Sequence, residues 1–301
     1  MKVLIIGAGN IGRALEQLIK SARDNCEIEI FDKDKDKVPF RKDLAETAPS
    51  ADFVFLAVPS SALEEVCAEL KPILHLETII ISLIKGLAGE KRQIADKFFK
   101  ENLAKKQALA FLFGPMLGDE LKQGKRGVGV VATKNPENFE KLQILFKNSG
   151  LNLEYTSDLS GVAILGVLKN IYALGLGIAD GLGWGMNMKG WLAASSMREM
   201  GDIIKMFGSR KDIVWGDAGL ADLITTGFSP SSKNRRTGEE LAKKGRNAEL
   251  ISEGIRSLPV IGGMLKDTPK TPVFKAIEET VKGNMPAEEA FRALIKGIFK
   301  H

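Results

Sequence analysis

The feature that most constrains this chain is a glycine-rich turn that directly follows a short apolar run. Residues 2–6 have the pattern of a buried β-strand, and Gly7-Ala8-Gly9-Asn10-Ile11-Gly12 opens a segment with helical periodicity. Glycines at this spacing, between a strand and a helix, are typical of a dinucleotide-binding turn. Gly7 permits the tight turn, Gly9 lets the backbone approach a pyrophosphate, and Gly12 allows close helix–strand packing. An ordinary glycine turn of an α/β protein is the alternative.

An acidic residue supports the nucleotide-binding interpretation. Asp32 lies 20 positions beyond Gly12 and ends a second apolar run, residues 28–31. A carboxylate there can bind both ribose hydroxyls of NAD and repels the 2′-phosphate of NADP. The neighbouring Lys33 offsets that repulsion only in part. We therefore expect NAD in preference to NADP, and the alternative is that Asp32 is only a turn residue.

The two halves of the chain have different patterns. Further apolar runs at 53–58, 78–82, 108–113 and 127–133 alternate with helical segments. This alternation predicts an α/β fold, an N-terminal Rossmann doubly wound parallel sheet covered by helices on both faces. After about Tyr155 the pattern becomes helical and rich in Ala, Leu, Gly and Met, which predicts an all-α C-terminal domain. We expect an NAD-binding domain at 1–155 and a substrate-binding domain at 156–301.

Composition argues against several classes of function. The 43 Lys and Arg residues and 38 Asp and Glu residues are mixed along the chain, and the net charge is +5. Nothing in this charge indicates nucleic-acid binding, whereas a small anionic ligand is compatible with it. Two cysteines and two histidines support neither a disulfide scaffold nor a metal centre, so we expect no metal.

No segment has the pattern of a membrane anchor or a signal peptide. The N-terminal apolar run is too short for a signal peptide. The most apolar later stretch, residues 161–185, carries Lys169 and Asp180, which a membrane span would not hold at those depths. We therefore expect a cytoplasmic protein without stable membrane insertion. The oligomeric state stays open, with a homodimer as one option.

Lys169 is the candidate for proton transfer. It lies in a helical stretch that is apolar on nearly every side, so its ammonium group has no easy route to water. A buried lysine has a depressed pKa and can exchange a proton near neutrality. Asn170 and Asp222 are natural partners for orienting the lysine or a substrate. A snorkelling lysine is the alternative.

A second polar segment is suited to binding phosphate. Residues 229–236 read Ser-Pro-Ser-Ser-Lys-Asn-Arg-Arg, which we interpret as a loop. Arginine makes bidentate bonds to phosphate oxygens, and serine and asparagine add neutral donors. A solvated basic turn is the alternative interpretation.

Several motifs in one order resemble a known family. They are Lys85-Gly86, Gly114-Pro115, Leu168-Lys169-Asn170, residues 178–183, residues 219–223 and residues 232–236. With the N-terminal glycines, they resemble the soluble NAD(P)-dependent glycerol-3-phosphate dehydrogenases from Lys2 to about Arg256. The resemblance implies reversible hydride transfer between dihydroxyacetone phosphate and sn-glycerol 3-phosphate. A role in glycerophospholipid synthesis would follow from that reaction.

The resemblance also implies roles for individual residues. Lys169 is expected to transfer the proton, and Lys85 to contact both cofactor and substrate, with Asp222 in the same catalytic group. From the residues and the resemblance together, the expected substrate-binding positions are Lys85, Gly114, Lys169, Asn170, Asp222, Ser232, Asn234 and Arg235. The expected cofactor-binding positions are Gly7, Gly9, Asn10, Ile11, Gly12, Asp32, Lys85, Gly118, Lys233 and Glu253.

The chain departs from the family pattern at several places, among them a short segment between Asn234 and Glu253. Met116 stands where many members have Ser or Thr after the Gly-Pro pair, which removes a hydroxyl donor from the expected substrate wall. Lys233 replaces an arginine of the bacterial pattern, which weakens the case for NADP. Asn10-Ile11 replaces a Ser-Trp or Ser-Tyr pair.

Two other functions stay open at this point. One is a Rossmann-fold dehydrogenase of the β-hydroxyacid type, although that group has a Lys-x-x-x-Asn spacing and here Asn170 follows Lys169 directly. The other is a non-catalytic NAD-binding regulator. Charged residues retained at Lys85, Lys169 and Asp222 argue against the regulator.

Overall fold

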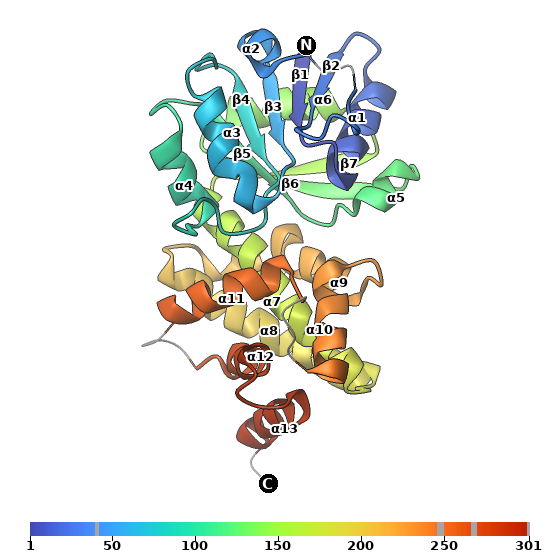
Figure 1. Cartoon of the computed structure of the whole chain (residues 1–301), viewed down its shortest axis with the longest axis vertical. Helices are drawn as coiled ribbons and strands as arrows, with labels where there is room; N and C mark the ends of the chain where they lie inside the picture. The colour runs from blue at the N-terminus through green and yellow to red at the C-terminus, as the bar shows by residue number, and fades with distance from the viewer. Residues whose placement is uncertain (40–41, 246–249, 266–269, 300–301) are drawn as a thin grey trace. The chain divides into compact units, whose positions relative to one another are not determined.

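The computed structural model describes residues 1–39, 42–245, 250–265 and 270–299 (Figure 1). The chain forms two compact units, residues 1–163 and 164–301. Helix α7, Leu159–Gly181, runs across this division. The boundary that we expect between residues 155 and 156 stays a prediction.

The first unit contains a seven-stranded sheet in the order β2-β1-β3-β4-β5-β6-β7. The strands are β1 Lys2–Ile6, β2 Glu27–Phe31, β3 Phe53–Leu56, β4 Ile79–Ser82, β5 Leu109–Phe113, β6 Gly127–Thr133 and β7 Leu151–Thr156. Every apolar run that we assigned to a strand contains one. Strand β7 escaped the sequence analysis because it lies at the sheet edge and only Leu151 is buried, so it has no continuous apolar run.

The sheet is mostly parallel, as predicted, and departs from this where β6 pairs with β5. β1 to β5 are parallel, but β6 is antiparallel to β5, and β7 is parallel to β6. The segment 114–126 returns to the same end of the sheet and includes only the short helix α5, Gly118–Lys122. It makes no crossover along a sheet face, and such a crossover is what a parallel neighbour requires.

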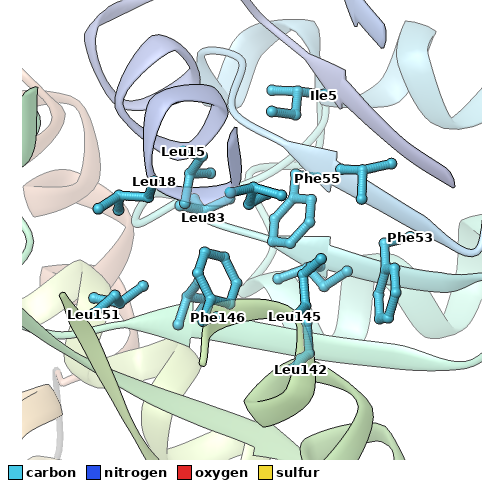
Figure 2. Close-up of a cluster of buried hydrophobic side chains, with 14 of the residues drawn as sticks. Ile5, Leu15, Leu18, Phe53, Phe55, Leu83, Leu142, Leu145, Phe146 and Leu151 are labelled. Carbon is cyan, nitrogen blue, oxygen red and sulfur yellow. The ribbon is translucent and has the colours of Figure 1, made fainter. Parts of the chain in front are cut away.

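Helices cover both faces of the sheet, as the apolar strands predict. On one face, α1 (Asn10–Ala22) and α6 (Pro136–Phe146) pack on side chains such as Phe55, and Figure 2 shows Leu15, Leu145 and Phe146 converging there. The opposite face carries α3 (Leu63–Leu70) and α4 (Ala95–Asn102). Each fully buried side chain of this size contributes about 1.5–3 kcal/mol.

The glycine turn lies at the point where the strand order reverses. The chain leaves β1 for β2 on one side, and leaves β3 for β4 on the other. In open α/β sheets, ligands bind outside the carboxyl ends of the strands at this switch point. Short helical segments complete the first unit: α2 Leu44–Thr47, η1 Ala48–Ser50 and η2 Ser60–Ala62.

The second unit is helical in its described residues, as predicted. After α7 come α8 Met186–Met206, η3 Lys211–Trp215, the π-helical turn η4 Asp217–Ala221, α9 Asp222–Phe228, α10 Lys233–Lys244, α11 Glu253–Met264, α12 Pro272–Lys282 and α13 Ala287–Ile298. Helix α7 is long and apolar enough to span a membrane, but its apolar window is entirely buried in the protein. It has the character of a core helix.

Candidate functional site

The glycine turn has the geometry that its spacing predicts. Gly7 has φ +107°, and a Cβ at Gly7 would lie 2.5 Å from the carbonyl oxygen of Ala57. A Cβ at Gly12 would lie only 1.9 Å from the Gly7 oxygen, so no larger residue fits between the turn and α1. At Gly9, by contrast, a Cβ would meet no atom within 4 Å. The backbone at Gly9 therefore faces open space, as a ligand-binding turn requires.

The amino end of α1 is suited to an anion. Gly9 is the N-cap, and the first intrahelical bond runs from the Arg13 N–H to the Gly9 oxygen. The three preceding N–H groups, those of Asn10, Ile11 and Gly12, have no acceptor within the helix. The first turn carries no acidic side chain. These residues fit the pyrophosphate of a dinucleotide.

Asp32 joins the second strand to the same turn. One of its carboxylate oxygens accepts a 2.8 Å hydrogen bond from the Ala8 N–H, and the other accepts one from the Asp34 N–H. The ammonium group of Lys37 lies 3.8 Å from Asp32 Oδ1, whereas Lys33 is paired with Glu65. The carboxylate is thus held beside the glycine turn, with the ammonium group of Lys37 close by.

Lys85 and Gly114 form a second contact in the first unit. Lys85 Nζ donates a 3.0 Å hydrogen bond to the Gly114 oxygen and lies 5.5 Å from the centre of the Phe113 ring. Gly114 has φ +127°, and a Cβ there would lie 2.6 Å from the Val128 oxygen. The glycine thus keeps this carbonyl where the lysine meets it.

Gly118 and Met116 have packing roles in the same segment. A Cβ at Gly118 would come within 3.0 Å of Asn10, so this glycine lets α5 approach the start of α1. Met116 packs against the core, and its sulfur lies 3.2 Å from the position of a Cβ at Gly129. The side chain that replaces the usual hydroxyl therefore fills space beside a glycine of β6.

In the second unit, Lys169 lies in a buried polar cluster. It is 6% exposed, and Asp222 is 2% exposed. Lys169 Nζ lies 3.0 Å from Asp222 Oδ1 and donates a 2.7 Å hydrogen bond to the hydroxyl of Thr226. That hydroxyl also lies 3.4 Å from the same Asp222 oxygen. A lysine held by one carboxylate and one hydroxyl can donate a proton in a fixed direction.

A chain of amide contacts adjoins this cluster. The side-chain amide of Asn234 donates a 2.9 Å hydrogen bond to Asn170 Oδ1 and accepts one of 3.0 Å from the Gly254 N–H. A Cβ at Gly254 would lie 2.5 Å from the Asn170 oxygen, so the glycine allows α11 to approach α7. Glu253 precedes this contact at the first position of α11.

The π-helical turn η4 leads directly into Asp222. A Cβ at Gly219 would lie 2.0 Å from the Val214 oxygen, so η4 can press against η3 only with glycine at this position. Single π-turns occur frequently at functional sites, because they change the direction in which a side chain leaves the helix. Here the residue that follows the turn is the partner of Lys169.

The interpretation of residues 229–236 as a loop is wrong in its second half. Helix α10 begins at Lys233, and the Ser232 hydroxyl caps it by accepting from the Arg235 N–H. Arg235 Nε lies 2.6 Å from Asp180 Oδ2, so its guanidinium is held by a carboxylate at the end of α7. The run of polar residues with one proline resembles a loop, so the sequence analysis missed this helix start. The start is set by the Ser232 cap.

The structure thus brings together Lys169, Asn170, Asp222 and Asn234 in the second unit, and the glycine turn with Asp32 in the first. It places Arg235 in a different set of contacts, with Asp180. Thr226 escaped the sequence analysis, although its position four residues after Asp222 puts both side chains on one helix face. Among the described residues, no group of three His, Cys, Asp or Glu side chains could hold a metal ion.

Two family models match the chain. Residues 33–139 match the N-terminal model of NAD-dependent glycerol-3-phosphate dehydrogenase, and residues 158–292 match the corresponding C-terminal model. A glycerol-3-phosphate dehydrogenase [NAD(P)+] of Fusobacterium nucleatum is 30% identical over 98% of this chain and 96% of its own length. That of Chlorobium phaeobacteroides is 27% identical over 98% of this chain and 97% of its own.

Solved structures agree in fold. The crystal structure of glycerol-3-phosphate dehydrogenase from Coxiella burnetii superimposes with a TM-score of 0.88, at 23% identity, over 98% of both chains. The Plasmodium falciparum enzyme gives 0.85 at 21% identity, over 97% of this chain and 94% of its own. The pairing of a mostly parallel sheet with a helical C-terminal unit is therefore shared with these proteins.

Proposed function

Because the chain belongs to the NAD-dependent glycerol-3-phosphate dehydrogenase family, we propose that it reversibly reduces dihydroxyacetone phosphate to sn-glycerol 3-phosphate. Lys169 is the proposed proton donor and acceptor. The contact between Lys169, Asp222 and Thr226 supports this proposal, because two oxygens bind the buried ammonium group and fix its orientation.

Reduction of a ketone needs a hydride on carbon and a proton on oxygen. A nicotinamide cofactor would supply the hydride, and the turn of Gly7, Gly9 and Gly12 would hold its pyrophosphate. Lys169 Nζ stabilises the negative charge that develops on the oxygen and delivers the proton. In the reverse direction, the neutral amine accepts a proton from the hydroxyl of glycerol phosphate. Asp222 and Thr226 keep Nζ directed at the same point throughout.

The phosphate of the substrate is proposed to bind at the amino end of α10. Lys233 is exposed there, and helix N-termini favour anions. Asn234, one residue on, contacts Asn170 beside the lysine cluster. The sequence predicts a direct contact between Arg235 and the phosphate. In this proposal Arg235 instead pairs with Asp180 of α7 and so helps to hold the amino end of α10 in place.

The first test follows NADH oxidation with dihydroxyacetone phosphate and with unphosphorylated dihydroxyacetone. We expect turnover of the phosphate ester and little or none of the free triose. Lys169→Met should lower kcat at least 100-fold, since general acid catalysis contributes about 10²–10⁴-fold. NADH affinity should be unchanged.

Lys282→Met is the matched control, because Lys282 is an exposed lysine of the same unit that pairs with Glu278 on its own helix. Its kcat should stay within about twofold of the wild type. If Lys169→Met retained full activity, the proposed mechanism would be wrong. Equal turnover of both trioses would remove the phosphate site.

NAD is proposed as the preferred cofactor on the basis of Asp32. We expect a lower dissociation constant for NADH than for NADPH, measured by fluorescence titration. Asp32→Asn should reduce that preference, because an amide no longer repels a 2′-phosphate and Lys37 remains close by. Tighter binding of NADPH by the wild type would contradict the proposal. A cytoplasmic location and a homodimer stay predictions.

A further inference from the structure

Three charged side chains of the second unit meet away from Lys169. We call Asp180, Lys189 and Arg235 the ionic cluster. Lys189 contacts one oxygen of Asp180, and Arg235 Nε lies 2.6 Å from the other, in an ion pair without hydrogen-bond geometry. Lys189 is only 7% exposed, and the side chains of Asp180 and Arg235 are 14% and 17% exposed. Asp180 is therefore shared by two cations, largely out of water, and Arg235 has a second carboxylate, Glu239, 3.7 Å away.

The cluster reaches the last residue of α9 through Lys189. Its ammonium group lies 4.8 Å from the centre of the Phe228 ring, at the distance of a cation–π contact. Helix α9 begins with Asp222 and carries Thr226, the two groups that hold Lys169. The same short helix therefore contacts the proposed proton-transfer lysine through Asp222 and Thr226, and the ionic cluster through its last residue, Phe228.

The cluster reaches the first turn of α10 through Arg235. Asn234, the residue before it, makes the contacts with Asn170 and Gly254. A Cβ at Gly177 would lie 1.9 Å from the Arg235 oxygen, so α7 and α10 touch backbone to backbone here. With contact this close, a shift of α10 by a few tenths of an ångström would move Asn234 relative to Lys169 on α7.

We propose that Asp180 and Lys189 are positioning residues, which hold α9 and α10 so that their side chains meet Lys169 and Asn170. This inference rests on the proposed function and extends it to residues that never touch the substrate. A buried ionic group is costly to desolvate, and apolar side chains of the same volume would brace two helices at least as well. A charged cluster also fixes the relative orientation of the helices, because each oxygen of Asp180 contacts a cation from a different helix.

The test compares Lys189→Met, which keeps the apolar stem and removes the charge, with Lys189→Arg, which keeps the charge. Lys189→Met should lower kcat/KM for dihydroxyacetone phosphate at least tenfold and leave the dissociation constant of NADH unchanged. Lys189→Arg should restore kcat/KM to within about threefold of the wild type. Backbone amides of residues 222–238 should exchange with solvent faster in Lys189→Met alone.

Leu294→Ala is the stability control, because it removes buried methyl groups from α13, a helix that carries no residue of the cluster, and so lowers the melting temperature. Its kcat/KM should stay within twofold. If Lys189→Met also stayed within twofold despite a lowered melting temperature, the cluster would be a structural brace and the proposal would fail. If the wild type turned over no dihydroxyacetone phosphate, the proposed function would fail. Amide exchange of residues 222–238 would then test the positioning role of the ionic cluster independently of catalysis. Unchanged exchange in Lys189→Met would overturn that role.

Discussion

At the scale of single residues, the two partners of Lys169 differ in how far their effects on folding stability and on catalysis can be separated. Lys169 and Asp222 form a buried ion pair, and removing either charge leaves the other uncompensated, at a cost of about 3–5 kcal/mol in stability. Substituting Asp222 therefore affects folding and chemistry together. Thr226 is the more informative partner, because its hydroxyl can be removed with almost no change in shape.

Thr226→Val should lower kcat about tenfold and should also lower the melting temperature, because a buried hydrogen bond to a charged group is lost. The hydroxyl accepts a 2.7 Å hydrogen bond from Lys169 Nζ, and hydrogen bonds to charged groups contribute about 1.5–3 kcal/mol. Without this acceptor, the ammonium group has one fewer fixed partner and spends less time aimed at the substrate. Steady-state kinetics with dihydroxyacetone phosphate measure the effect.

Thr280→Val provides the comparison for that change. Thr280 is also buried, but its hydroxyl donates to the Ala276 oxygen within α12. It should leave kcat within about twofold. Equal losses of activity in both variants would show that a buried threonine hydroxyl matters only for stability here.

At the scale of elements, the glycine turn illustrates two different requirements for the same residue type. Gly12→Ala should abolish NADH binding and lower the melting temperature, because its Cβ would lie 1.9 Å from the Gly7 oxygen and α1 must move. Gly9→Ala should weaken NADH binding at least tenfold with the melting temperature unchanged. A Cβ at Gly9 meets no protein atom and occupies only the space in front of the helix.

Calorimetry and NADH titration of the two variants test this distinction. Gly190→Ala in α8 is the control, since a Cβ there meets nothing within 4 Å and alanine is the better helix former. It should leave NADH affinity unchanged. A Gly9→Ala variant that bound NADH like the wild type would argue against pyrophosphate binding at this turn.

Elements were predictable where their signal is local. Continuous apolar runs marked six strands, and the fold class is confirmed by the sheet and by the family match. The antiparallel turn between β5 and β6 left no such mark, because strand direction depends on the path of segment 114–126. The start of α10 at Lys233 was also missed, because Ser232 acts as a cap only once its neighbours have folded.

At the scale of the whole molecule, one buried carboxylate makes stability depend on pH. Glu199 of α8 accepts hydrogen bonds from the N–H groups of Val273 and Phe274 on α12, and from the Tyr172 hydroxyl of α7. Burial outweighs these bonds and raises the pKa of Glu199 to about 7, from an ordinary value of 4.5. The folded protein therefore binds more protons than the unfolded chain between these two values.

The free energy of unfolding should fall as the pH rises from about 4.5 to 7. A shift of this size corresponds to a loss on the order of 3 kcal/mol across that window, with no further contribution from Glu199 at higher pH. Glu199→Gln should flatten the profile, because the amide does not titrate. Urea unfolding at a series of pH values measures the slope.

Glu288→Gln is the reference variant, since Glu288 is an exposed residue of α13 that pairs with Arg292 on the same helix. It should keep the slope of the wild type. If Glu199→Gln kept the same slope as well, the pH dependence would have to come from other groups.

The sequence by itself determined the family, the glycine-rich turn between a strand and a helix, and the identity of the buried lysine. These depend on local order: glycines between a strand and a helix, and one charge in an apolar helix. The sequence also suggested Asp222 as a partner of that lysine, but only the tertiary structure showed the contact and added Thr226, because these residues lie 53 and 57 positions away along the chain. The tertiary structure also decided that Arg235 faces Asp180, since the partner of a charge depends on helix packing, which no local pattern encodes.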